Sequence, residues 1–221
     1  MMKQHRDVVP LILSILLLLG IFFFAFLRHN RGIGAWSKSP LDLDLIFAGL
    51  YSVWILVEYP VAKKDVNTEG KSTLDFGTCQ AYALGQAGTI LTALCFPSIW
   101  RAPSAVHFLG IFIFIIGILY RLWAIRTLGQ FYSHRVRKVE QHQIVASGPY
   151  RIIRHPAYSG MITAHAGLTL YFFNWVTLAV FLVILVPSIF LRIFFEEKML
   201  YEIEGYSDFA KEKKRLFPAI W

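Results

Sequence analysis

The chain has 221 residues, of which 56% are hydrophobic and 16% charged, and its formal net charge is +8. This composition is too apolar for an ordinary soluble domain, and it offers no soluble basic face for a nucleic acid, so it indicates a membrane protein. The two cysteines, Cys79 and Cys95, fall in apolar sequence, and the seven histidines are scattered. We therefore expect no disulfide framework, no metal and no nucleic-acid partner.

Apolar runs that approach or exceed the ~20 residues needed to cross a bilayer recur along the chain. The first, VVPLILSILLLLGIFFFAFL at 8–27, follows a basic N-terminus like that of a secretory signal. RHNRG follows it in place of a small-residue cleavage site, so we interpret it as a retained span. We predict an all-α polytopic membrane bundle of about six spans, at 8–27, 43–62, 76–99, 104–125, 158–173 and 175–195.

The distribution of lysine and arginine predicts the orientation of this bundle. With six spans, the segments on one side hold seventeen of these residues and the segments on the other side hold four. Positively charged loops tend to stay in the cytoplasm, so both termini are expected there. The membrane, with its lipids around the spans, would be a bacterial inner membrane or the endoplasmic reticulum.

The fifth predicted span is short, because sixteen residues reach only ~24 Å, against ~30 Å for the hydrocarbon core. The sequence FFNW then breaks it, so 158–195 is predicted to be a helical hairpin whose arms pack face to face. Gly160, Ala164 and Gly167 share one face, where small residues let backbones approach closely. The polar segments that flank the hairpin are expected to fold together over its open end as a cytosolic pocket.

The densest polar cluster is GPYRIIRHPAYSG at 148–160. The GP pair predicts a turn, and Pro156 fits the first turn of a helix, which places His155 near the N-cap and Tyr158 in the first turn. Free backbone N–H groups, the helix dipole and two nearby arginines make this a place for an anionic group. The alternative is a basic membrane-flanking loop that contacts lipid phosphates.

A second polar cluster, RIFFEEKMLYEIEGY at 192–206, emerges directly from the last apolar run. Charges at that depth are costly unless they are paired, so Arg192, Glu196 and Glu197 are functional candidates. Because a hairpin returns to its starting side, these three side chains are expected to lie close to the cluster at 148–160. A cationic turn that faces an acidic pair can hold a zwitterion.

The ionisable residues within predicted spans include His165 and Arg121. His165 is expected to make a hydrogen bond between helices, with the alternative that it lines a substrate tunnel. Arg121 lies near the end of the fourth span, and its long side chain is expected to extend to the lipid headgroups.

Three blocks of sequence, QFYSH at 130–134, HQIVASGPYRIIRHPAYSG at 142–160 and RIFFEEKMLYEIEGYSDFAKEKKRLFP at 192–218, resemble the isoprenylcysteine carboxyl methyltransferase family. They are similar, more distantly, to the phospholipid N-methyltransferases. The resemblance implies a methyltransferase-like region at 126–221 after N-terminal transmembrane helices at 1–125. It also implies that S-adenosylmethionine is the methyl donor, bound between the cytosolic loop and the C-terminal tail.

The resemblance further implies roles for individual residues. Arg192 and Glu197 match a pair tied to substrate and catalysis. The residues implied in cofactor binding are Gln130, His134, Val145, Gly148, Tyr150, Arg154, His155, Pro156, Tyr158 and Glu196. The reaction implied is methyl transfer to a lipophilic small molecule or prenylated protein, with the carboxylate of an isoprenylcysteine-like substrate as the first expectation.

Three alternatives remain open at this point. A phospholipid amine acceptor would have to lose a proton, which makes Glu197 the candidate base. A sterol-type membrane reductase that uses NADPH has a similar turn, but it carries asparagine where this chain has Ala157 and an acid where this chain has Met161. A non-enzymatic transporter would place polar residues near the middle of several spans, and the first four spans have few.

Overall fold

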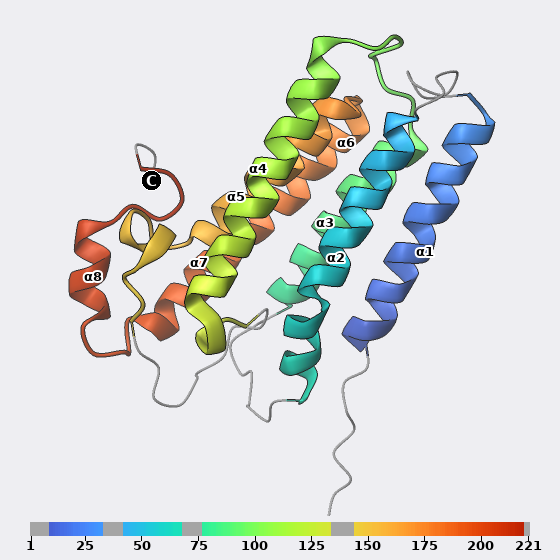
Figure 1. Ribbon diagram of the computed structural model, residues 1–221. Helices are drawn as coiled ribbons and strands as arrows, with labels where there is room; N and C mark the ends of the chain where they lie inside the picture. Colours follow the sequence, from blue (N-terminus) through green and yellow to red (C-terminus); the bar gives the residue numbers. More distant parts are fainter. Residues whose placement is uncertain (1–8, 33–41, 68–76, 134–143, 219–221) are drawn as a thin grey trace, which may run out of the picture.

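The computed structural model describes residues 9–32, 42–67, 77–133 and 144–218, and Figure 1 shows a bundle of elongated helices. In these ranges the regular structure is helical apart from one isolated bridge between Ile153 and Lys214, which confirms the all-α prediction. The longer helices are α1 (Val9–Asn30), α2 (Leu43–Asn67), α3 (Thr78–Cys95), α4 (Ala105–Leu128), α5 (Pro156–Tyr171) and α7 (Val186–Leu200). The shorter elements are η1 (Gly129–Phe131), η2 (Gly148–Arg151), α6 (Trp175–Val180), η3 (Phe181–Leu185) and α8 (Tyr206–Glu212).

Four segments of the described chain are long and apolar enough to cross a membrane: Ile12–Asn30, Leu43–Val61, Ala105–Phe131 and Trp175–Leu200. They correspond to the first, second, fourth and sixth predicted spans. The third and fifth are α3 and α5, which have 18 and 16 residues, and α5 is mostly buried among the other helices. The polytopic membrane bundle is therefore confirmed, while the number of crossings stays a prediction.

The closest helix packing is between α4 and α5. A Cβ atom added at Gly117 of α4 would fall on the backbone of Ala164, and one added at Gly160 would meet the backbone of Arg121. A Cβ at Gly167 would likewise meet α4. The small face of α5 thus packs against α4 and not, as predicted, against the other arm of the hairpin, which contacts α5 less closely, mainly through η3. The spacing of small residues in α5 correctly predicted a face that allows close approach. The helix that packs on this face is α4, which has its own glycines at the contact.

The chain does reverse direction after α5, as predicted. Asn174 caps α6 by accepting the backbone N–H of Thr177 at 2.9 Å. The π-helical turn η3 then leads into α7 next to Pro187, whose missing N–H removes one regular helical hydrogen bond there. The neighbour of this arm is α3, because a Cβ at Gly85 would meet the backbone of Leu185.

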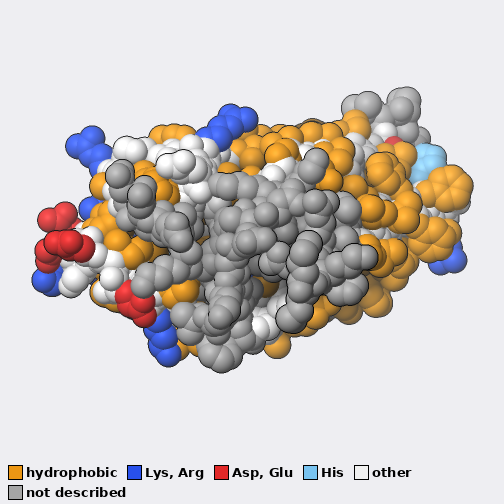
Figure 2. All heavy atoms as spheres, turned by 90° about the horizontal axis from the view of Figure 1, so that it is seen from below, with side chains coloured by type: hydrophobic (Ala, Val, Ile, Leu, Met, Phe, Trp, Pro, Cys, Tyr) orange, Lys and Arg blue, Asp and Glu red, His pale blue; other side chains and the backbone are white. Residues whose placement is uncertain are grey.

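The polar segments lie at one end of the bundle. In Figure 1, η2, the end of α7 and α8 gather at the left, beside the lower end of α4. Figure 2 shows hydrophobic side chains along the flank and charged side chains around the α8 end. Large apolar side chains on the flanks, such as Leu19, Leu119 and Val183, are exposed by 60%, 61% and 72%. Such a surface is suited to lipid and not to water.

Candidate active site

The C-terminal tail closes over the start of α5. The backbone N–H groups of Arg154 and His155 donate to the carbonyl groups of Lys214 and Arg215, both at 2.9 Å. These bonds attach the tail to the RHP turn, which is defined as residues 154–156. The two long polar segments of the sequence therefore fold together at this end of the bundle.

The element η2 leads into the RHP turn. Gly148 has φ +55°, a conformation that favours glycine, and a Cβ there would also come within 2.9 Å of the Thr127 side chain. The turn buries Tyr150, and burial raises the pKa of its hydroxyl above the usual value. Tyr150 therefore faces the site as a neutral phenol that can donate a hydrogen bond.

Glu197 is the centre of a buried ion cluster. Its Oε1 lies 3.1 Å from Nε2 of His155 and 2.8 Å from Nη1 of Arg154, and its Oε2 accepts from Nε of Arg215 at 2.8 Å. The residue is only 4% exposed. One carboxylate thus joins α7, the RHP turn and the tail. The prediction that the basic turn meets the acidic end of the last helix is confirmed.

A second chain of polar contacts runs along α7. Nε of Arg192 donates to the hydroxyl of Tyr158 at 3.2 Å, and that hydroxyl donates to Oε2 of Glu196 at 2.9 Å. The guanidinium group of Arg192 also lies over the ring of Tyr82 in α3, 5.3 Å from its centroid. Arg192 is 2% exposed, so its charge acts in a dry environment where electrostatic effects are strong.

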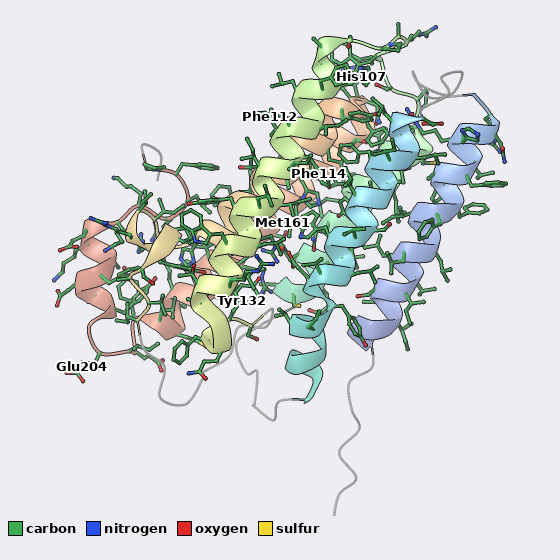
Figure 3. All side chains as sticks on the ribbon, viewed as in Figure 1. His107, Phe112, Phe114, Tyr132, Met161 and Glu204 are labelled. Atoms are coloured by element: carbon green, nitrogen blue, oxygen red, sulfur yellow. The ribbon has the colours of Figure 1, made fainter. Side chains whose placement is uncertain are left out.

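A half-open pocket lies between the lower end of α4, the RHP turn, the end of α7 and α8. Tyr132, labelled in Figure 3 beside the lower end of α4, is one of the residues that line it. The lining residues are Leu128, Phe131, Tyr132, Ser133, Ile144, Val145, Tyr150, Arg154, His155, Ala157, Tyr158, Arg192, Glu196, Met199, Leu200, Tyr206 and Phe209.

Seven of the residues expected from the sequence line this pocket together: Val145, Tyr150, Arg154, His155, Tyr158, Arg192 and Glu196. Gln130, Pro156 and Glu197 adjoin lining residues in the chain without lining the pocket themselves, and Gly148 lies two residues before the lining residue Tyr150. His134 falls outside the described residues. The individual roles of all these residues stay predictions.

Several lining residues were not anticipated, among them Tyr132, Tyr206 and Phe209. The first belongs to the QFYSH block and the other two follow Gly205, in the third block. The resemblance therefore pointed at the segments but gave no reason to select these side chains. What they share is an aromatic ring at the polar end of an otherwise apolar bundle.

The pocket contains two buried donors without a hydrogen-bond partner in the described part of the chain, Nε of Arg154 and the hydroxyl of Tyr206. Leaving such a group unsatisfied costs ~1–3 kcal/mol, so a bound ligand gains by satisfying it. With the carboxylate of Glu196 nearby, the wall offers both donors and an anion. This set fits the amino-acid zwitterion of S-adenosylmethionine, and the aromatic rings fit its adenine.

Of the two ionisable residues considered in the predicted spans, Arg121 differs from expectation and His165 agrees with it. Arg121 does not extend to headgroups, because it is 1% exposed and pairs with both oxygens of Glu58 at 2.6 and 2.8 Å. An apolar bundle makes this pairing more favourable than a partly exposed charge. His165 makes the expected hydrogen bond between helices, with its Nε2 3.1 Å from the hydroxyl of Tyr51.

Comparison with known proteins places this geometry in a family. Residues 109–202 match the model of the "Isoprenylcysteine carboxyl methyltransferase (ICMT) family". A probable protein-S-isoprenylcysteine O-methyltransferase of Oryza sativa subspecies indica is 30% identical over 132 residues, which cover 58% of this chain and 69% of the rice protein. The chain belongs to the isoprenylcysteine carboxyl methyltransferase family. It is an integral-membrane methyltransferase, as the resemblance implied.

Further relatives of this methyltransferase agree. Protein-S-isoprenylcysteine O-methyltransferase B of Arabidopsis thaliana is 32% identical over 106 residues, 46% of this chain and 54% of the plant protein. The structure of a eukaryotic intramembrane Ras methyltransferase of the same family aligns with a TM-score of 0.57 at 22% identity, covering 98% of this chain and 88% of that one. The shared fold therefore extends to α1–α3, which lie outside the family-matched residues. The expected boundary at 125 falls inside α4, and that division stays a prediction.

Proposed function

We propose that this methyltransferase transfers the methyl group of S-adenosylmethionine to the carboxylate of an isoprenylcysteine-type lipophilic acceptor, carried by a small molecule or a prenylated protein. The pocket would face the cytoplasm, where the donor is dissolved, and both termini would lie on that side. The observation that carries the proposal is the chain from Arg192 through Tyr158 to Glu196. It places a buried cation and a carboxylate in the same pocket wall.

The donor would be held by the polar end of the pocket. Arg154 and Tyr206 offer unsatisfied donors to its carboxylate, and Glu196 attracts its ammonium group. When bound, S-adenosylmethionine supplies an electrophilic methyl group, and transfer of that group to a carboxylate oxygen leaves a neutral thioether and moves no proton. Tyr150 and His155 shape the wall against which the donor is oriented. Catalysis of this kind depends on positioning and electrostatics.

The arrangement of Glu197 favours a carboxylate over an amine as the acceptor. An amine acceptor requires a base, and Glu197 was the candidate. Its oxygens are already engaged by His155, Arg154 and Arg215, which stabilise the anion and make it a weak proton acceptor. A carboxylate needs no base, and Arg192 supplies the positive charge that orients it.

The lipophilic part of the acceptor would lie among the apolar helices. The pocket wall combines polar groups with apolar side chains, among them Leu128, Met199, Leu200 and Phe209. An acceptor with an isoprenoid tail and an anionic head matches such a mixed wall at the end of an apolar bundle. Closing this site to water also strengthens the attraction between Arg192 and the carboxylate.

The test uses purified protein in detergent with methyl-labelled donor and an N-acetyl-S-prenylcysteine as acceptor. The proposal expects a product whose label is released by mild base, as for a methyl ester, and saturable binding of S-adenosylhomocysteine. The carboxamide of the same acceptor should not be methylated. Label found on a phospholipid amine, stable to base, would overturn the choice of acceptor. Binding of NADPH in place of S-adenosylhomocysteine would overturn the choice of donor.

A further inference from the structure

Tyr82 of α3 lies against two residues that line the pocket. It is 8% exposed, and its hydroxyl has no hydrogen-bond partner among the described residues. Its ring lies under the guanidinium group of Arg192, at 5.3 Å, and meets the ring of Tyr158 edge to face at 6.3 Å between centroids. Arg192 and Tyr158 both line the pocket. This tyrosine thus connects α3, which lies outside the family-matched residues, to the site.

A buried phenol without a partner is unusual, because the unmade hydrogen bond costs ~1–3 kcal/mol and most buried polar groups are satisfied. Arg192, whose guanidinium group lies over the Tyr82 ring, has only donors and cannot accept this bond. The missing acceptor for Tyr82 is therefore a group that the described chain does not supply.

We propose that Tyr82 is an acceptor-binding residue, whose hydroxyl donates to the carboxylate that Arg192 orients. This inference rests on the proposed function and names the group that recognises the anionic head of the substrate. A carboxylate has two oxygens, and only one of them is methylated. Donors from Tyr82 and Arg192 on the other oxygen fix its orientation, while the reacting oxygen keeps its lone pair. No proton leaves Tyr82 in the reaction.

The position of Tyr82 favours the acceptor over the methyl donor as its ligand. The unsatisfied groups assigned to the donor, on Arg154 and Tyr206, come from the loop and α8 at the polar end. Tyr82 comes from α3, which packs against α6, η3 and α7 within the apolar bundle. A lipophilic substrate reaches the pocket from among the helices. The carboxylate at its head then meets Tyr82 and Arg192 together.

The experiment compares the wild type with Tyr82→Phe, which removes only the hydroxyl. The KM for an N-acetyl-S-prenylcysteine should rise roughly tenfold or more, as expected for the loss of one hydrogen bond to a charged group. The Kd for S-adenosylhomocysteine should not change. The carboxamide of the acceptor serves as a competitive inhibitor, and its Ki should rise less, because its neutral carbonyl oxygen accepts a weaker hydrogen bond. The preference of the site for carboxylate over carboxamide should therefore fall.

The matched control is Tyr51→Phe, which removes the hydroxyl of a buried tyrosine that is already bonded to His165 at 3.1 Å. It should leave KM and the preference for carboxylate unchanged. If Tyr82→Phe methylates the acceptor with wild-type KM and preference, the phenol has no role in recognition and the inference is overturned. If the wild type binds S-adenosylhomocysteine but does not methylate the prenylcysteine, the proposed acceptor is wrong and the inference falls with it.

Discussion

Nε2 of His155 lies 3.1 Å from Oε1 of Glu197, although 42 residues separate them in the chain. The contact joins the start of α5 to the end of α7, and Arg154 and Arg215 bind the same carboxylate. Through this cluster the buried carboxylate of Glu197, on α7, fixes the positions of the RHP turn and the C-terminal tail relative to α7. Disturbing it should therefore affect the pocket before it affects the bundle.

Glu197→Gln should abolish methyl transfer while the protein still folds. The amide keeps the shape of the side chain but removes the charge that compensates three donors, and breaking a buried pair in this way costs ~3–5 kcal/mol. Turnover of labelled donor, helical circular dichroism and the Kd of S-adenosylhomocysteine are the measurements. Asp208→Asn on α8, where the carboxylate side chain is 83% exposed, is the control and should behave as wild type. Wild-type turnover in Glu197→Gln would remove this residue from the mechanism.

His155→Ala should weaken binding of S-adenosylhomocysteine, because the imidazole lines the pocket and is held by Glu197. Combining it with Glu197→Gln tests whether the two act together. Residues in one network typically show an interaction energy of ~0.5–3 kcal/mol, so the double variant should lose less than the sum of the two single losses. Titration calorimetry of all four proteins gives the cycle. An unchanged Kd in His155→Ala would reduce the RHP turn to a loop that contacts lipid.

The local chemistry of this site could be predicted because it depends on short spacings. Pro156 specifies the first turn of a helix, Arg192 and Glu196 are one helical turn apart, and a reversal after α5 brings both groups to one side. None of these inferences needs to know how the helices pack. The aromatic lining residues Tyr206 and Phe209 were not predicted, because they reach the pocket only through the placement of α8, which does depend on packing.

The partners of buried faces could not be predicted from spacing. Gly160 and Gly167 mark a face that accepts a close neighbour, but the neighbour is α4 and not α7. The place of Arg121 near the end of its span predicts a side chain that reaches the headgroups. Its actual partner, Glu58, is 63 residues away, and nothing in the sequence aligns the two. In both cases the missing information is which helices are adjacent, and side-chain pattern alone does not fix it.

Gly117→Ala should destabilise the bundle strongly. The added methyl group would overlap the backbone of Ala164, which cannot move as a flexible side chain can, so α4 and α5 would have to separate. Thermal unfolding in detergent should show a loss of ~2 kcal/mol or more, within the range for overpacked sites. Gly49→Ala in α2 is the matched control, because a Cβ there meets nothing within 4 Å. It should be neutral or slightly stabilising. Equal effects at the two positions would contradict the close packing of α4 and α5.

The pair formed by Arg121 and Glu58 is expected to position the pocket as well as stabilise the bundle. Besides Glu58, Arg121 donates to the hydroxyl of Tyr132 at 3.0 Å and to the carbonyl of Ala157 at 3.2 Å, and both of these residues line the pocket. Glu58→Gln leaves a buried guanidinium group without its counter-charge and should cost ~3–5 kcal/mol of unfolding free energy.

Replacing both members with apolar residues separates the two roles. Glu58→Leu combined with Arg121→Met removes both buried charges, and such replacements are often neutral or stabilising, so the unfolding temperature in detergent should recover. Binding of S-adenosylhomocysteine should not recover, because Tyr132 and Ala157 have lost the donor that holds them. A double variant that regains both stability and wild-type affinity would show that the pair serves the bundle alone. Recovered stability with weak binding of S-adenosylhomocysteine would show that Arg121, which does not line the pocket, positions the lining residues Tyr132 and Ala157.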